Sequence, residues 1–231
     1  MELAEDSRAA EWLTTGLRGF AESVCSLVPC GFPAYVRVFH PAERRIDAAT
    51  PIPVRWREIA SATGTRAHPA MQLPVMTGVT QFDDLPGVYD YPPEVGSLPP
   101  ELAGPLAATL AQHTNTPDRC WFAVWSGHGW LPEWMLQAPI FQLPHREYYL
   151  LTGPIDCAAD GDLGSGMESA NLWWPEDQAW CVATEIDLNT TYVGCDEACR
   201  DEILALPGLE TAAIDSTSGI SRASDFVNAD A

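Results

Sequence analysis

Short apolar runs separated by turn residues dominate the second half of the chain. Residues 120–126 are apolar on both faces, as a central strand of a sheet is, and residues 147–152 have the same character. Residues 171–174 and 179–187 flank a turn at 175–178, an arrangement that predicts a β-hairpin. Runs joined by such short connections pair antiparallel, so the sequence predicts a mainly antiparallel sheet.

Other segments predict helices that would cover this sheet. The alternation of residues 34–40 predicts a further strand, and apolar spacing predicts helices at 12–24, 53–60, 102–110 and 196–206. We therefore expect a single α+β domain over residues 1–214, with a mainly antiparallel sheet of about five strands packed by helices. Seven prolines in residues 66–100 predict an irregular loop or a lid, and residues 215–231 are expected to form a flexible tail.

The chain is strongly acidic. Its 231 residues carry 32 acidic side chains against 12 basic ones, a net charge of −20, and every basic side chain is an arginine. A charge of this sign repels phosphate backbones and anionic lipids, so we expect neither nucleic-acid nor membrane binding. The first residues lack the positive charge of a secretory signal, and no stretch reaches the roughly 18 apolar residues of a membrane span. We therefore expect a cytoplasmic protein.

The charge is unevenly distributed along the chain. Residues 1–146 hold 15 acids and 10 arginines, a net charge of −5, whereas residues 147–231 hold 17 acids and two arginines, a net charge of −15. Residues 37–66 have a local excess of arginine. Two interpretations remain open: these arginines pair with the acidic region inside one fold, or the acidic region presents a face to a basic partner.

The cysteines and histidines do not predict a metal site. The chain has seven cysteines, an odd number, and without an export signal we expect them to be reduced, small apolar residues. No pair of cysteines has the spacing of a zinc knuckle, and the five histidines show no metal-ligand spacing. We expect no metal and no cofactor.

Three tryptophans flank the turn of the predicted hairpin. Trp173, Trp174 and Trp180 combine rigid aromatic area with the charges of Glu176 and Asp177, a combination typical of a partner-binding hot spot. The alternative is that the tryptophans fill the core. Because consecutive strand residues face opposite sides of a sheet, Trp173 or Trp174 should lie near the surface unless both faces are covered.

A pair of carboxylates lies on one face of the longer predicted strand. Glu185 and Asp187 could carry out general acid–base chemistry or hold a hard cation, although such pairs more often form a solvated sheet edge. If the chain is an enzyme, Glu185, Asp187 and His113 are the catalytic candidates. The proline-rich segment 66–100 would then serve as its lid.

Three segments resemble a family of uncharacterised proteins that is common in high-GC actinobacteria. They are HTNTPDRCWFAVW (113–125), LPHREYYLLTGP (143–154) and SANLWWPEDQAWCVATEID (169–187). The similarity extends over most of the chain and is weaker in 66–100. The family often has a second glycine after the position of Gly194, where this chain has Cys195. The resemblance implies a GC-rich bacterial origin, but no activity, cofactor or site residue.

We expect an acidic, non-enzymatic protein-binding module of the cytoplasm, an immunity or antidote-like factor or a regulatory accessory protein. Its partner would present a basic surface and dock at the acidic hairpin, on Glu176, Asp177, Glu185 and Asp187. One alternative is a small-molecule enzyme of the hydrolase type, which needs one of the candidate carboxylates beside a histidine in a closed pocket. Another is a ligand sensor with an aromatic pocket around Trp121, Trp125 and Trp130. The oligomeric state is left open.

Overall fold

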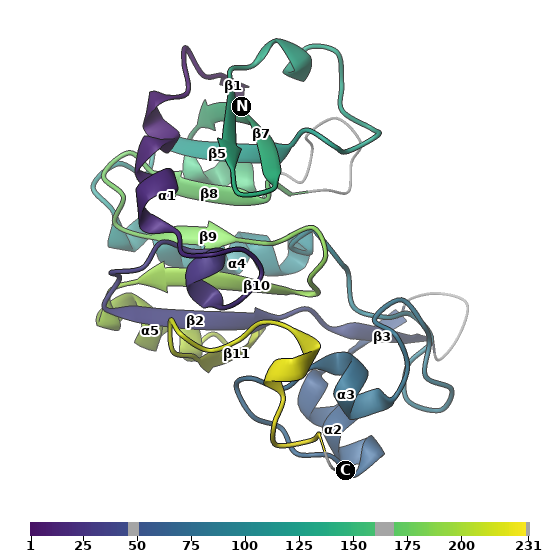
Figure 1. The fold of residues 1–231 in the computed structure, drawn as a ribbon. Coiled ribbons are helices and arrows are strands. Elements are labelled where there is room, and N and C mark those ends of the chain that lie inside the picture. Colours follow the sequence, from purple (N-terminus) through teal and green to yellow (C-terminus); the bar gives the residue numbers. More distant parts are fainter. Residues whose placement is uncertain (46–50, 160–168, 230–231) are drawn as a thin grey trace.

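A long antiparallel sheet organises the molecule (Figure 1). The computed structural model describes residues 1–45, 51–159 and 169–229. Within them, the main sheet has nine strands. Its path runs through β1 (Glu2–Leu3), β7 (Arg146–Gly153), β5 (Cys120–Trp125), β8 (Leu172–Pro175), β9 (Cys181–Ala183), β10 (Thr190–Cys195), β2 (Ala34–Phe39) and β11 (Glu210–Ala213). Strand β6 (Ile140–Leu143) pairs with β7, and β3 (Ala42–Arg45) pairs with β4 (Pro51–Val54) in a separate ribbon.

Helices cover both faces of the sheet. Figure 1 shows α1 (Glu11–Gly16) in front of it, with α4 (Pro100–Leu110) and α5 (Glu197–Leu204) behind. Helices α2 (Trp56–Thr63) and α3 (Leu73–Thr77) pack beside the β3–β4 ribbon at one end. The fold is therefore the α+β class that the sequence predicts.

The alternating pattern of β2 shows how the two faces are filled. Val36 and Val38 face α4 and α5, whereas Tyr35 belongs to the core cluster on the α1 side. Because both sides are buried, the central strands are apolar throughout. The sheet has more strands than the predicted five, since several of the additional ones are short edge strands that lack a clear alternation, such as β1, β6 and β11.

The C-terminal segment is held in place. The buried carboxylate of Asp225 accepts hydrogen bonds from the backbone N–H of Gln72 at 3.0 Å and from Asn228, and it lies 2.8 Å from Nε2 of His68. The prediction of a flexible tail is therefore wrong for residues 215–229.

The proline-rich segment is a packed connection rather than an open lid. It contains α3, and Met71, Leu73, Met76 and Tyr89 are buried in the core cluster formed with α2. Its carbonyl groups also accept hydrogen bonds from the buried guanidinium of Arg37, at Pro69 and Met71. These contacts correct the expectation of a lid over residues 66–100.

Two local expectations about the N-terminal region are also corrected. The helix predicted over 12–24 ends at Gly16, where an added Cβ would lie 2.7 Å from Cβ of Pro29. Cys25 and Cys30 form a disulfide in the following loop, so the prediction that all cysteines are reduced is wrong for this pair. The other five cysteines are free. None of the described helices is both long and apolar enough to cross a membrane.

Candidate functional site

The strand registers place the predicted site residues at opposite ends of the central sheet. Along the pairing of β5 with β8, Pro175 marks one end and Leu172 the other. Along β10 the same ends are marked by Cys195 and Thr190. We call the end at Pro175 and Cys195 the acidic end, and the end at Leu172 and Thr190 the cleft end.

The four carboxylates expected to form one docking surface are thereby separated. Glu176 and Asp177 follow β8 at the acidic end, whereas Glu185 and Asp187 follow β9 at the cleft end. The prediction of a single site on the hairpin is wrong, because the hairpin strands themselves lie between the two pairs.

The three hairpin tryptophans lie in the core. Trp173 and Trp174 are each 1% exposed and Trp180 is fully buried. Trp173 packs on the α4 and α5 side and Trp174 on the α1 side. The indole N–H of Trp180 donates to the carbonyl of Leu110 at 2.9 Å. The expectation that these indoles contact a partner is therefore corrected: both faces of the sheet are covered, so neither consecutive tryptophan reaches the surface.

At the acidic end, the hairpin turn is fastened to the segment before β5. Asp177 accepts hydrogen bonds from the hydroxyl of Thr114 at 2.7 Å and the backbone N–H of Asn115 at 2.8 Å. Partial burial alone would raise its pKa, but these hydrogen bonds hold the pKa of Asp177 below its ordinary value. Glu176 pairs with Arg119 at 2.6 Å.

His113 connects the same segment to α5. Its Nε2 lies 3.1 Å from Oε2 of Glu202, and its Nδ1 lies 3.9 Å from Oδ1 of Asp196. Asp196 also caps α5, accepting from the backbone N–H of Cys199 at 2.7 Å. His113 therefore lies at the acidic end, away from Glu185 and Asp187, and the predicted catalytic grouping of these three residues is wrong.

Segments distant in sequence thus form one acidic surface, which we call the acidic face. Its cations are Arg119, paired with Glu176, and Arg200, paired with Asp201 at 2.9 Å. Its carboxylates are Asp118, Glu176, Asp177, Asp196, Glu197, Asp201 and Glu202.

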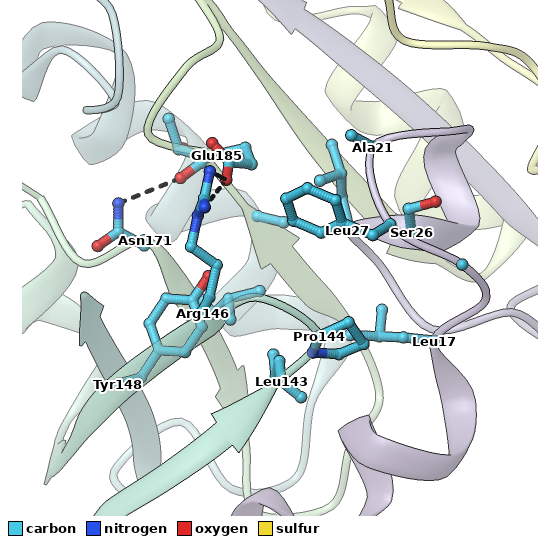
Figure 2. A pocket seen from close by; sticks show the side chains of 15 residues that line it. Leu17, Ala21, Ser26, Leu27, Leu143, Pro144, Arg146, Tyr148, Asn171 and Glu185 are labelled. Carbon is cyan, nitrogen blue, oxygen red and sulfur yellow. Dashed lines mark hydrogen bonds and ion pairs between the residues drawn. The ribbon is translucent and has the colours of Figure 1, made fainter. Parts of the chain in front are cut away.

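At the cleft end, one arginine holds both of the other carboxylates. Figure 2 shows Arg146 beside one of them, Glu185. Nε of Arg146 donates to Glu185 at 2.7 Å, and Nη2 donates to Asp187 at 2.9 Å. The guanidinium also lies over the rings of Phe20 and Trp125, at 5.2 and 5.9 Å from their centroids. Burial raises the pKa of Glu185, although Arg146 opposes the shift. Glu185 is therefore engaged inside the protein, whereas Asp187 is paired with Arg146 but its side chain is 74% exposed.

A narrow cleft lies beside this ion cluster. Figure 2 shows Leu17, Leu27, Leu143 and Pro144 along its apolar wall and Tyr148 near the charged groups. The space open to the centre of a water molecule is about 40 Å³, enough for a few waters. Such a cleft has no room for a sizeable substrate.

A row of buried polar side chains crosses the sheet near this cleft. Nε2 of His40 lies 2.9 Å from the hydroxyl of Thr191, which is 2.7 Å from the hydroxyl of Thr184. The side-chain amide N–H of Asn171 donates to the carbonyl of Thr184 at 3.3 Å. Oδ1 of Asn171 lies 3.3 Å from Nε2 of His128. Sequence reasoning missed this row, whose only signal is polar residues at the ends of apolar strands.

The acid–base geometry that a hydrolase needs is not formed at the predicted carboxylates. Among the described residues, no histidine lies within hydrogen-bonding distance of Glu185 or Asp187. The described residues also hold no group of three or more acidic, histidine or cysteine side chains suited to a metal ion. The site residues therefore give no support to hydrolysis at this end.

Replacing Arg146 by methionine should lower the free energy of unfolding by about 1–3 kcal/mol. The Glu185 side chain is only 12% exposed and would lose its cation. The double variant Arg146→Met, Glu185→Gln removes both charges and should recover most of the loss. Urea denaturation at pH 7 measures both values, and an Arg146→Met protein as stable as the parent would contradict this role of the ion pair.

None of the family models, curated proteins or solved structures compared with the chain matches it. The geometry of the two ends of the sheet is therefore what bears on function.

Proposed function

We propose that this protein binds a basic partner protein through its acidic face. The observation that carries the proposal is the surplus of carboxylates there, seven against two arginines that are already paired. Complementary charge speeds association and selects partners, so such a face suits an immunity, antidote-like or regulatory role.

Helix stability does not account for these carboxylates. Glu197 lies in the first turn of α5, where a negative charge is favourable, but Asp201 and Glu202 lie in its second half. Negative charge near the C-terminus of a helix opposes the helix dipole, and α5 has no basic residue in its last turn. A partner that neutralises Asp201 and Glu202 would relieve this cost.

Internal pairing does not account for them either. Among the described residues, no ion pair joins the arginines of 37–66 to a carboxylate of 147–229. Arg37 is buried under the rings of Phe39, Trp56 and Tyr192 instead. The acidic face therefore keeps a surplus of carboxylates, because its cationic partners within the described part of the chain are only Arg119, Arg200 and His113.

A cytoplasmic location is part of the proposal. Five of the seven cysteines are free, as is usual in a reducing compartment, whereas the Cys25–Cys30 disulfide would there be exposed to reduction. Counting free thiols in the protein isolated under alkylating conditions tests this part separately.

Cross-linking by a water-soluble carbodiimide tests the proposed interface. This reagent joins carboxylates to lysine amines, and the chain has no lysine, so apart from its N-terminal amine it can be linked only to another molecule. We expect a basic protein to be captured through Glu197, Asp201 and Glu202. Cross-links that map mainly to the cleft end, or that spread evenly over the surface, would contradict the proposal.

A further inference from the structure

A second cavity opens at the cleft end, beside the Arg146 ion cluster. Its volume is about 350 Å³, within the usual range for small-molecule sites. Residues 94–97, before α4, form one wall of its lining. The rest of the lining is Trp125 and His128 at the end of β5, Ser169 before β8, and Ile186 and Asp187 after β9.

The lining contains two carboxylates and no arginine. Among the described residues, the Glu94 carboxylate has neither an ion pair nor a hydrogen-bond donor. Partial burial and the nearby charges of Glu101 and Glu43 raise the pKa of Glu94. Asp187 shares Arg146 with Glu185, so two negative charges there face one positive charge. The cavity is thus an environment that favours a cation.

The rest of the lining suits an organic cation with N–H donors. Burial lowers the pKa of His128, so its imidazole is neutral at pH 7 and offers an acceptor nitrogen. The hydroxyls of Ser97 and Ser169 already accept hydrogen bonds from the backbone N–H groups of Ser169 and Leu98, respectively, at 2.8 Å, so they add polarity rather than free acceptors. The indole of Trp125 provides an aromatic wall.

A hard metal ion fits this cavity less well. Calcium takes six to eight oxygen ligands, and the described residues contain no cluster of three metal-binding side chains. An ammonium group needs only a few acceptors around it, and its carbon chain can lie against Trp125 and Ile186.

We propose that this cavity binds a small aliphatic diamine, held by Glu94 at one end and by Asp187 at the other. The site is independent of the acidic face, which lies at the opposite end of the sheet. Glu94 and Asp187 both line this one cavity, and Glu94 to Ser97 form a continuous segment of its wall.

Isothermal titration with butane-1,4-diamine tests the proposal, with butane-1,4-diol as the neutral analogue of the same length. We expect saturable binding of the diamine and no measurable binding of the diol. Glu94→Gln should weaken diamine binding at least about tenfold, because it removes a charge-assisted hydrogen bond. Glu101→Gln is the matched control, since Glu101 is exposed and close to Glu94 but outside the lining, and it should change affinity less than about twofold.

Several results would overturn the proposal. Absence of saturable diamine binding would do so, as would equal binding of the diol or equal losses in the two glutamine variants. Displacement of the diamine by an equal concentration of magnesium ions would show that the site attracts counter-ions only. Thermal melting of Glu94→Gln should match the parent, so that lost binding reports on the cavity rather than on folding. Neutralising the acidic face should leave diamine binding unchanged.

Discussion

Replacing Trp180 by alanine should lower the free energy of unfolding by about 3–5 kcal/mol, the usual cost of removing a large buried aromatic side chain. Trp180 is fully buried, and its ring meets that of Trp173 edge to face at 5.3 Å. The substitution would also leave the carbonyl of Leu110 without its hydrogen bond from the indole. Urea denaturation at pH 7 measures the loss.

Trp134 provides the matched control. It is 41% exposed, so Trp134→Ala should change the free energy of unfolding by only about 0.5 kcal/mol. A Trp180→Ala protein as stable as the parent would show that the indole is not part of the core. The three hairpin tryptophans, Trp173, Trp174 and Trp180, would then again be candidates for a partner-binding surface.

Acidification from pH 7 to pH 4 should destabilise the protein through His40. This side chain is fully buried, and burial lowers its pKa to about 4 from an ordinary value near 6.5. Between these two values the unfolded chain binds a proton that the folded chain does not, so stability falls as the pH falls. The difference of about 2.5 units between the two pKa values corresponds to a loss of about 3 kcal/mol in the free energy of unfolding. This loss is complete near pH 4 and absent above pH 7.

His40→Gln isolates this contribution from the other titrating groups. Glutamine can still hydrogen-bond near Thr191 and the carbonyl of Glu94, which His40 contacts at 2.9 and 2.7 Å, but it does not titrate. Urea denaturation of both proteins at pH 7 and pH 4.5 should show a smaller loss of stability in the variant. Parallel pH profiles would contradict a neutral, buried His40.

The central strands could be predicted from the sequence because they are buried on both faces. β5 and residues 148–151 of β7 are apolar runs, and the β8–β9 hairpin is marked by its turn. The short strands β1 and β11 could not be predicted in this way, because two or four residues hold too little alternation to be recognised. The sequence predicts a tail for the C-terminal segment because its anchor, Asp225, is a single polar residue whose partners, His68 and Gln72, are distant in the chain.

For the candidate site, the sequence predicts the excess of negative charge but not how the charged side chains are arranged. The acidic excess of residues 147–231 is visible in the sequence. The ion pairs that engage Glu176 with Arg119 and Glu185 with Arg146 join residues far apart in the chain, so spacing does not reveal them. The covering of both sheet faces, which buries Trp173 and Trp174, is likewise a property of the whole fold.

The affinity of the cross-linked basic partner for charge-matched variants tests the central claim most directly. One variant neutralises the acidic face (Asp118→Asn, Glu197→Gln, Asp201→Asn, Glu202→Gln), and the other neutralises four exposed carboxylates elsewhere (Glu2→Gln, Glu5→Gln, Asp84→Asn, Glu133→Gln). Their net charges are equal, so only the position of the lost charges differs. We predict at least about tenfold weaker binding, with a reduced salt dependence, for the first variant and less than about twofold for the second. Equal losses in both variants, or none in either, would contradict an interface on the acidic face.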